Sequence, residues 1–294
     1  MRIENSYSLK PHNSLRLEST AEYYCEITNQ EEAQEAIEFA NNKDSSITFL
    51  GEGTNVILGP NYIGLVIKNS INQKSIEKKQ IHAGGGVNWN ELVLWSLQNN
   101  LFGLENLVLI PGSVGAAPIQ NIGAYGSEVS NFIEEVICFD MESNCLVSFT
   151  NNDCKFSYRQ SIFQDKDFLI VVKVKFKLTK DFYPNLDYED LNFLNAEGVS
   201  PFIIRKHILE IRKAKISDPK EHPNVGSFFK NPIISLDELE KIKLILPNIK
   251  FYSYIDNKVK ISAAFLIESL NLKGFALNDA RVSEKHSLVL ENKS

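Results

Sequence analysis

A run of eighteen residues with almost no side-chain bulk, residues 109–126, constrains the fold more than any other stretch of the chain. Its sequence, LIPGSVGAAPIQNIGAYG, contains four glycines, two prolines and two adjacent alanines. Pro118 and the glycines exclude a regular helix, and the same residues disfavour a central strand. What remains is a tight, irregular backbone whose N–H groups can approach a large anionic ligand. Taken by itself, the run is also compatible with an ordinary glycine-rich surface loop.

The glycines of the chain are unevenly distributed. Twelve of the 15 lie between Gly51 and Gly126, in three main clusters at residues 51–53, residues 84–86 and the run described above. None of the clusters is followed by the Lys-Ser/Thr pair of a nucleoside-triphosphate-binding loop, and none matches the dinucleotide fingerprint Gly-x-Gly-x-x-Gly. A Rossmann domain is therefore not supported. Three bare loops in one region predict a single ligand with several polar segments.

Length and composition place the chain among ordinary globular proteins. With 294 residues, 43% of them apolar and 23% charged, two domains or three small ones are expected. A net charge of −6 argues against non-specific nucleic-acid binding. No long apolar run and no hydrophobic N-terminal core is present, so we expect neither a membrane span nor a secretory signal. The cysteines lack C-x-x-C spacing and the histidines show no H-E-x-x-H motif, so we expect reduced cysteines and no metal site.

The hydrophobic pattern mixes helices and strands without a regular βαβ rhythm, which predicts the α+β class. Helices are expected at residues 31–39, 88–98, 200–213, 237–246 and 262–270, with Asn88 and Ser262 as N-caps. Strands are expected at residues 46–50, 64–68, 81–83, 132–139, 145–149, 172–178 and 286–290, the fourth and fifth forming a hairpin. The polar segment 181–200 is expected to be an insertion or mobile loop. The linker 218–223, which contains two prolines, predicts a domain boundary.

Five segments point to a known family by their sequence and their order. They are LGEGTNV (50–56), GLENL (103–107), IPGSVGAAPIQNIGAYG (110–126), YRQSIF (158–163) and GSFFKNP (226–232). Together they closely resemble the UDP-N-acetylenolpyruvoylglucosamine reductase family of bacterial peptidoglycan synthesis, and the resemblance runs from about residue 8 to residue 290. It implies the FAD-binding fold shared with vanillyl-alcohol-oxidase-like flavoproteins. Two FAD-binding subdomains (1–68 and 69–217) and a substrate-binding domain (218–294) are expected.

The resemblance also implies a reaction with two halves. NADPH reduces FAD, and the flavin then transfers a hydride to the enolpyruvyl group while an acid protonates the neighbouring carbon, giving UDP-N-acetylmuramate. Charge builds up on the adjoining carboxylate during this transfer, so a cation must be in place there beforehand. Arg159 is the family's arginine by its motif, and its planar fork suits a carboxylate. Ser227 matches the family's proton donor. Read without the motifs, Arg159 is compatible with a structural salt bridge and Ser227 with a helix or turn cap.

Further contacts follow from the same resemblance. FAD is expected to contact the first and third glycine clusters, namely Gly51, Gly53, Thr54, Asn55, Pro111, Gly112, Ser113, Gly115, Ala116, Gln120, Asn121, Gly123, Ala124, Tyr125 and Gly126. The UDP-sugar is expected to contact Arg212, Lys215, Lys230, Asn231 and Lys273, with Tyr188 and Tyr252 covering the bound nucleotide. Tyr188 lies in the segment 181–200, and this segment is typical of the longer class of the family.

The sequence departs from the family at its C-terminal side. In the family a helix, a strand and a glutamate that assists the arginine and the serine follow the region that matches residues 286–290, and this sequence shows no counterpart of that glutamate. We therefore expect reduced turnover and some uncovered apolar surface. The alternatives are a truncated, catalytically impaired flavin- or nucleotide-binding paralogue and an oxidase of the same superfamily; the GSFFKNP motif speaks against the oxidase. We expect a cytoplasmic monomer that contributes to cell-wall synthesis.

Overall fold

The computed structural model describes residues 1–194 and 197–294 and divides the chain into two compact units. The first unit consists of Met1–Asn13, Glu18–Gly53 and Leu58–Arg212, and the second of Ser14–Leu17, Thr54–Ile57 and Lys213–Ser294. Helices and strands are mixed in both units, which confirms the predicted α+β class. Most residues of both predicted FAD-binding subdomains belong to the first unit.

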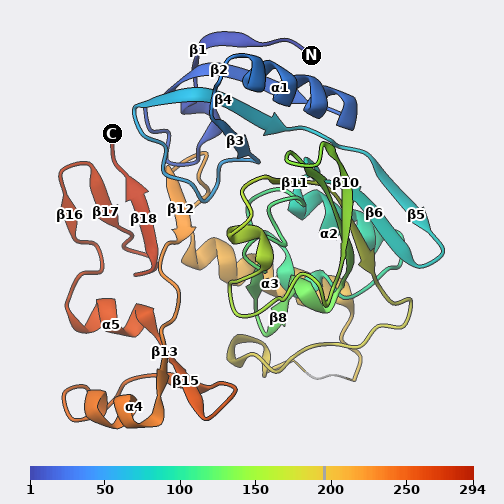
Figure 1. The fold of residues 1–294 in the computed structure, drawn as a ribbon. Coiled ribbons are helices and arrows are strands. Elements are labelled where there is room, and N and C mark those ends of the chain that lie inside the picture. The colour runs from blue at the N-terminus through green and yellow to red at the C-terminus, as the bar shows by residue number, and fades with distance from the viewer. Residues whose placement is uncertain (195–196) are drawn as a thin grey trace. The chain divides into compact units, whose positions relative to one another are not determined.

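A four-stranded sheet of the order β1-β2-β4-β3 begins the first unit. Its strands are β1 (Glu4–Ser8), β2 (Thr20–Ile27), β3 (Ile47–Leu50) and β4 (Asn61–Asn69), and both β2 and β3 pair with β4 in parallel. Helix α1 (Gln30–Asn42) connects β2 to β3 and packs Ala33, Ala36, Ile37 and Ala40 on the sheet (Figure 1). This spacing of apolar residues is that of one helix face. The sequence predicted α1, β3 and β4, and it missed β1 and β2.

A second, five-stranded antiparallel sheet has the order β10-β9-β11-β6-β5. It consists of β5 (Lys74–Glu77), β6 (Gln80–Gly84), β9 (Ile133–Asp140), β10 (Cys145–Thr150) and β11 (Leu169–Lys177). In the last part of β11, Val174 and Phe176 are fully buried while Lys173 and Lys177 are exposed, so one face of the strand packs on the core and the other faces solvent. The predicted hairpin is also present, because β9 and β10 pair in antiparallel register.

Two helices complete the core around this sheet. Helix α2 (Trp89–Gln98) begins where the Asn88 side chain accepts a hydrogen bond from the Glu91 N–H at 3.0 Å, which confirms the predicted N-cap. Helix α3 is longer than predicted and spans Pro201–Lys215. Trp89 of α2 and Ile204 of α3 belong to the same buried cluster as the residues of β11. The glycine-rich segments 84–86 and 109–126, which precede and follow α2, are therefore connected to a well-packed core.

The run 109–126 folds mostly as turns, as its composition predicts, and contains the two-residue strand β7 (Gly123–Ala124) near its end. β7 pairs with the two-residue strand β8 (Ser127–Glu128), which directly follows the run. Leu109, Asn121 and Tyr125 have φ angles of +57°, +45° and +48°. Non-glycine residues rarely adopt this left-handed region, so the surrounding contacts must hold the backbone there.

The second unit contains two small antiparallel sheets. One has the order β12-β18-β17-β16, with β12 (Asn224–Ser227), β16 (Ala276–Leu277), β17 (Ala280–Val282) and β18 (Val289–Asn292). The other has the order β13-β15-β14, with β13 (Ile233–Ser235), β14 (Phe251–Ser253) and β15 (Lys258–Ile261). Helices α4 (Leu236–Lys243) and α5 (Ala263–Ser269) belong to this unit, and Ser262 caps α5 as predicted.

The strand predicted at residues 286–290 is wrong over its first half, since β18 begins only at Val289. His286 explains the difference. Its Nδ1 accepts a hydrogen bond from the Leu288 N–H at 3.2 Å, and its carbonyl accepts one from the Val289 N–H at 3.0 Å. These two bonds close a turn, and the backbone of a turn cannot continue a strand.

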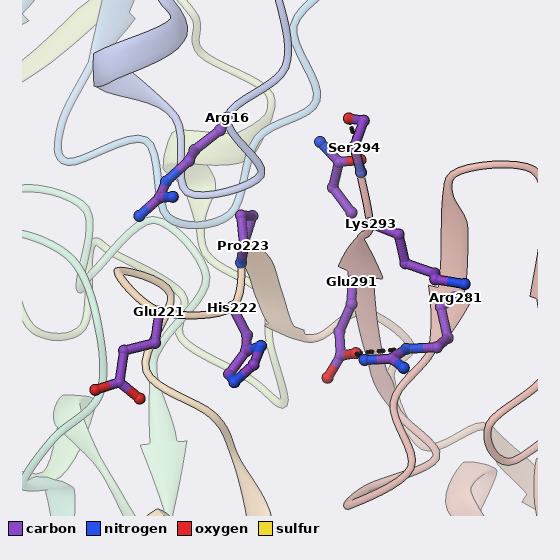
Figure 2. Close-up of a pocket in the computed structure, with 9 residues that line it drawn as sticks. Arg16, Glu221, His222, Pro223, Arg281, Glu291, Lys293 and Ser294 are labelled. Carbon is purple, nitrogen blue, oxygen red and sulfur yellow. Dashed lines mark hydrogen bonds and ion pairs between the residues drawn. The ribbon is translucent and has the colours of Figure 1, made fainter.

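A charged pocket of about 380 Å³ lies within the second unit (Figure 2). It is lined by Arg16, Glu221, His222, Pro223, Arg281, Glu291, Asn292, Lys293 and Ser294. On one wall, the Nε and Nη2 atoms of Arg281 donate to one carboxylate oxygen of Glu291 at 2.9 and 2.6 Å and join β17 to β18. The Glu291 side chain is only 5% exposed. None of the residues predicted to bind FAD or substrate lines this pocket.

Replacing Arg281 by Met is expected to lower the free energy of unfolding by about 3 kcal/mol, because a buried carboxylate loses its partner. The double substitution of Arg281 and Glu291 by Met removes both charges and is expected to recover most of that loss. Urea denaturation measures both effects. Lys243→Ala is the matched control, since its ion pair with Glu240 is largely exposed on the Glu240 side and is expected to cost less than about 1 kcal/mol. Equal losses in R281M and K243A would contradict the assignment.

Candidate functional site

The three glycine clusters meet within the first unit. The N–H of Gly115 donates to the carbonyl of Gly85 at 2.8 Å, and a Cβ added at Gly115 would lie 2.9 Å from the same oxygen. A Cβ added at Gly51 would lie 2.7 Å from the Ser113 hydroxyl. Real Cβ atoms are excluded at such distances. The first role of these glycines is thus to let loops 51–53, 84–86 and 112–116 pack on one another.

Close packing leaves some main-chain donors of these loops without a partner. Gly53 and Ser113 are both buried, and within residues 1–194 and 197–294 their N–H groups make no hydrogen bond. Buried N–H groups in proteins are almost always satisfied. Main-chain donors at bare loops are the groups that proteins use to bind phosphate. This part of the first unit therefore fits a ligand that carries phosphate oxygens, such as a flavin dinucleotide.

The other predicted flavin contacts are divided between the two units. Pro111, Gly112, Ala116, Gln120 and Ala124 lie along the run in the first unit. Thr54 and Asn55 belong to the second unit. The Thr54 carbonyl accepts a hydrogen bond from the Ser14 hydroxyl at 3.3 Å. The roles of all these residues in binding FAD stay predictions.

The Asn121 side chain holds the second half of the run in place through hydrogen bonds. Its side chain is fully buried; the amide nitrogen donates to a Glu128 carboxylate oxygen and to the Ser157 carbonyl, each at 3.0 Å. Its amide oxygen accepts from the Ser130 N–H at 3.1 Å. The side chain is therefore committed to the fold, and a contact of Asn121 with FAD is expected from its main chain.

Arg159 lies against this second half of the run. Its Nη1 donates to the Asn121 carbonyl at 3.2 Å and its Nη2 to the Gly123 carbonyl at 2.5 Å, while the nearest Glu128 oxygen is 3.9 Å from Nη1. A Cβ at Gly123 would lie 2.9 Å from Nη1, so the bare glycine makes room for the guanidinium. The side chain is 26% exposed. Arg159 is thus a partly exposed cation that donates hydrogen bonds to two neutral carbonyl groups.

A second arginine joins the two ends of the run. Arg212, near the end of α3, donates from Nε to the Leu109 carbonyl at 3.1 Å and hydrogen-bonds to the side chain of Tyr125. Burial lowers the pKa of its guanidinium, and the interaction with Tyr125 opposes that shift. The Tyr125 ring packs edge-on against Tyr188, with ring centroids 5.3 Å apart. Arg212 and Tyr188, both predicted to contact the substrate, therefore lie next to Tyr125, which is predicted to contact the flavin.

The segment that carries Tyr188 is anchored to the run by two asparagines that the sequence prediction missed. The Asn106 amide donates to the Tyr125 carbonyl at 2.8 Å and to the Asn185 carbonyl at 3.0 Å. The Asn185 amide donates to the Gly126 carbonyl at 3.1 Å. Residues 195 and 196 of this predicted loop lie outside the described residues. Asn106 lies in the GLENL motif (103–107), so that motif could have indicated that Asn106 matters for the site.

In the second unit, two of the predicted substrate lysines gather around His286. Burial lowers the pKa of His286; Lys215 and Lys273 lower it further, and Glu268 raises it. Glu268 lies 3.9 Å from the Lys273 ammonium and accepts a hydrogen bond from Ser287 at 3.0 Å. Two lysines and one carboxylate act on the charge of His286, and a surplus of positive charge suits an anion. His286 was missed because an isolated histidine in a sequence carries no signal.

The remaining predicted residues of the second unit lie on its strands and loops. Ser227 ends β12 and is exposed, and its hydroxyl makes no hydrogen bond within the described part of the chain. No helix begins directly after it, which removes the alternative of a helix cap. Asn231 accepts a hydrogen bond from the Ala263 N–H at 3.1 Å at the start of α5. Tyr252, on β14, is 47% exposed, and Lys230 is exposed.

Comparison with known proteins agrees with this arrangement. Residues 21–143 match the family model of the FAD binding domain, and residues 218–294 match that of the UDP-N-acetylenolpyruvoylglucosamine reductase C-terminal domain. The chain is 37% identical to the UDP-N-acetylenolpyruvoylglucosamine reductase of Salmonella typhimurium over 98% of this chain and 86% of that protein. It is 39% identical to the reductase of a Shewanella species over 97% of this chain and 86% of that protein.

A solved structure supports the fold. The crystal structure of UDP-N-acetylenolpyruvylglucosamine reductase from Thermus caldophilus is similar with a TM-score of 0.73 at 23% identity, and the match covers 100% of this chain and 89% of that one. The fold and the glycine-lined first unit define an FAD-binding oxidoreductase. More narrowly, the chain belongs to the UDP-N-acetylenolpyruvoylglucosamine reductase family. No helix within the described residues is long and apolar enough to cross a bilayer.

Replacing Gly115 by Ala is expected to lower the free energy of unfolding by about 1–3 kcal/mol and to weaken FAD binding, because the new methyl group would push the loops apart. Thermal denaturation of the apoprotein and titration with FAD measure the two effects. Gly59→Ala is the matched control, since nothing lies within 4 Å of a Cβ added there, and its effect is expected within about 0.5 kcal/mol. Wild-type stability and FAD affinity in G115A would disprove the close approach.

Proposed function

We propose that the chain catalyses the NADPH-dependent reduction of UDP-N-acetylenolpyruvoylglucosamine to UDP-N-acetylmuramate, with FAD as the bound cofactor. Membership of the reductase family carries this assignment. Bound FAD supplies the hydride chemistry, accepting a hydride from NADPH and passing one to the enolpyruvyl double bond. The residues of the chain bind and orient the reactants, stabilise the charge that develops, and move one proton.

Arg159 is the residue that we assign to the enolpyruvyl carboxylate. As the hydride adds to the double bond, negative charge moves toward that carboxylate, and a guanidinium already in place stabilises it without reorganisation. The support for this role is the set of carbonyl contacts from Asn121 and Gly123, which orient the guanidinium. The Arg159 side chain is 26% exposed, and the planar fork of a guanidinium suits a substrate carboxylate.

Ser227 is assigned as the proton donor. A hydroxyl is a weak acid, so it needs a free orientation toward the substrate and a charge stabiliser near the reacting carbon. Its exposure at the end of β12 and the absence of a capping role support this assignment. The proton leaves the Ser227 hydroxyl for the carbon next to the one that receives the hydride.

We assign the diphosphate of the UDP-sugar to Lys215 and Lys273, with Tyr188 and Tyr252 covering the nucleotide and Asn231 nearby. The support is the clustering of the two lysines around His286 and the exposure of both tyrosine rings. Lysine ammonium groups bind phosphates as mobile point charges. We further propose a cytoplasmic monomer that serves peptidoglycan synthesis; the four free cysteines are typical of a reducing compartment.

Replacing Ser227 by Ala is expected to slow the reduction of the enolpyruvyl substrate at least about a hundredfold, since its proton donor is lost. Reduction of the flavin by NADPH does not use this proton and is expected to stay within about twofold of wild type. Stopped-flow absorbance of the flavin separates the two half-reactions. Ser269→Ala, at an exposed serine at the end of α5, is the control. A wild-type protein that oxidises NADPH equally fast with and without the enolpyruvyl sugar nucleotide would refute the proposed function.

Replacing Arg159 by Lys keeps the charge and removes the fork. We expect the rate of hydride transfer to substrate to fall about ten- to a thousandfold, because one oriented donor to the developing carboxylate charge is lost. Single-turnover oxidation of the pre-reduced enzyme by the substrate is the measurement. Arg2→Lys, the same exchange at a side chain that is 85% exposed, is the matched control and is expected to leave the rate unchanged. An unchanged rate in R159K would remove Arg159 from the chemistry.

A further inference from the structure

The segment 181–200 was predicted to be an insertion or mobile loop, and its described part is attached to the first unit on both sides of Tyr188. Before Tyr188, the Phe182 ring packs edge-on against Phe102, with ring centroids 5.6 Å apart. After it, Leu191 is fully buried in the core cluster, and its N–H donates to the Tyr188 carbonyl at 2.7 Å. A segment with buried apolar anchors opens less readily than one without them. Tyr188 is therefore an exposed ring on a backbone that is held in place.

Two asparagine side chains attach the same segment to the end of the glycine-rich run. The Asn106 amide donates to the carbonyls of Tyr125 and Asn185, at 2.8 and 3.0 Å, so one side chain joins the run to the segment that carries Tyr188. The Asn185 amide donates to the Gly126 carbonyl at 3.1 Å. Asn106 is only 2% exposed, and water does not easily replace a hydrogen bond that is lost at a buried group. The three hydrogen bonds therefore fix the backbone just before Tyr188.

The contact between the run and the segment is close because it is made at a glycine. Gly126 has a φ of +77°, and a Cβ added there would lie 3.4 Å from the Asn185 Oδ1 and 3.8 Å from the Tyr188 Cβ. Next to this contact, the Tyr188 ring packs edge-on against Tyr125, with ring centroids 5.3 Å apart. The ring that is predicted to cover the nucleotide thus lies directly beside residues that are predicted to contact FAD.

We propose that Asn106 and Asn185 are positioning residues for the substrate. They hold Tyr188 in the place from which it covers the nucleotide of the UDP-sugar, and they raise the affinity for this substrate without touching it. The physical reason is that binding under a mobile ring has to order the ring and its backbone, which costs free energy, whereas a ring that is already held avoids part of that cost. The inference rests on the proposed function, because it deepens the role that Tyr188 has there.

The test measures the binding of UDP-N-acetylenolpyruvoylglucosamine to the oxidised holoprotein by calorimetry, without NADPH. Asn185→Ala removes one hydrogen bond at a partly buried side chain and is the main variant. Asn106→Ala removes two bonds at a buried position, so N185A keeps the test decisive if N106A folds poorly. Tyr188→Ala and the double variant N185A/Y188A complete a double-mutant cycle. Asn152→Ala, at an exposed asparagine that follows β10, is the matched control.

N185A is expected to raise the Kd of the sugar nucleotide about three- to tenfold, the loss typical of one hydrogen bond. Its FAD affinity, and its single-turnover rate of hydride transfer at saturating substrate, are expected to stay within about twofold of wild type. Because Asn185 acts through Tyr188, the double variant is expected to bind within about twofold of Y188A alone. N106A is expected to raise the Kd at least as much as N185A, and N152A to match wild type.

Two results would overturn the inference while leaving the proposed function intact. One is wild-type affinity for the sugar nucleotide in N185A. The other is full additivity of N185A and Y188A, which would mean that Asn185 does not act through Tyr188. A wild-type holoprotein that does not bind the sugar nucleotide would instead refute the proposed function, and this inference with it. The wild-type titration therefore distinguishes the two failures.

Discussion

The contact on which the rest of the site depends is the hydrogen bond between the main chains of Gly85 and Gly115, 2.8 Å long. The Gly85 N–H in turn donates to the carbonyl of Val172 on β11. A chain of main-chain bonds therefore runs from the central sheet through the second glycine cluster into the run 109–126. Side chains at either glycine would open this chain, because a Cβ at Gly85 would lie 2.3 Å from the Val171 carbonyl. The irregular run is thus positioned by the regular sheet.

Once the run is docked, its strained backbone has to be held in place. Positive φ angles at Leu109, Asn121 and Tyr125 each cost on the order of 1–3 kcal/mol and persist only where neighbours over-determine them. Each has an identifiable support. Arg212 holds the Leu109 carbonyl and the Tyr125 side chain, and the buried amide of Asn121 makes three hydrogen bonds. Positive φ angles also occur elsewhere in the chain, as at Asp44 and Asn144, so what distinguishes the run is the set of side-chain contacts that hold it.

The sequence predicted the parts of this molecule whose signal is local. The α1 and α2 patterns, the caps at Asn88 and Ser262 and the turns of the run depend on near neighbours, and all are found. Strand β2 was missed because a strand is recognised by its pairing partners, and β4 lies far along the chain. The start of β18 was misplaced because a side-chain bond of His286 decides it. At the site, the sequence motif was enough to predict Arg159. The carbonyl groups that hold Arg159, and the contact of Arg212 with Tyr125, could not be predicted because they join segments that are distant in the sequence.

Arg159 and Arg212, both of the first unit, have different surroundings. A cation that serves a transition state has to be oriented beforehand and must not be consumed by a strong partner, since only interactions that strengthen during the reaction accelerate it. Arg159 is oriented beforehand by the carbonyl groups of Asn121 and Gly123. Arg212 instead contacts the Leu109 carbonyl and the Tyr125 side chain, so it joins the two ends of the run 109–126. One guanidinium therefore holds the irregular backbone of the site in place, while the other is the one to which we assign the charge that develops during the reaction, although the two side chains are chemically identical.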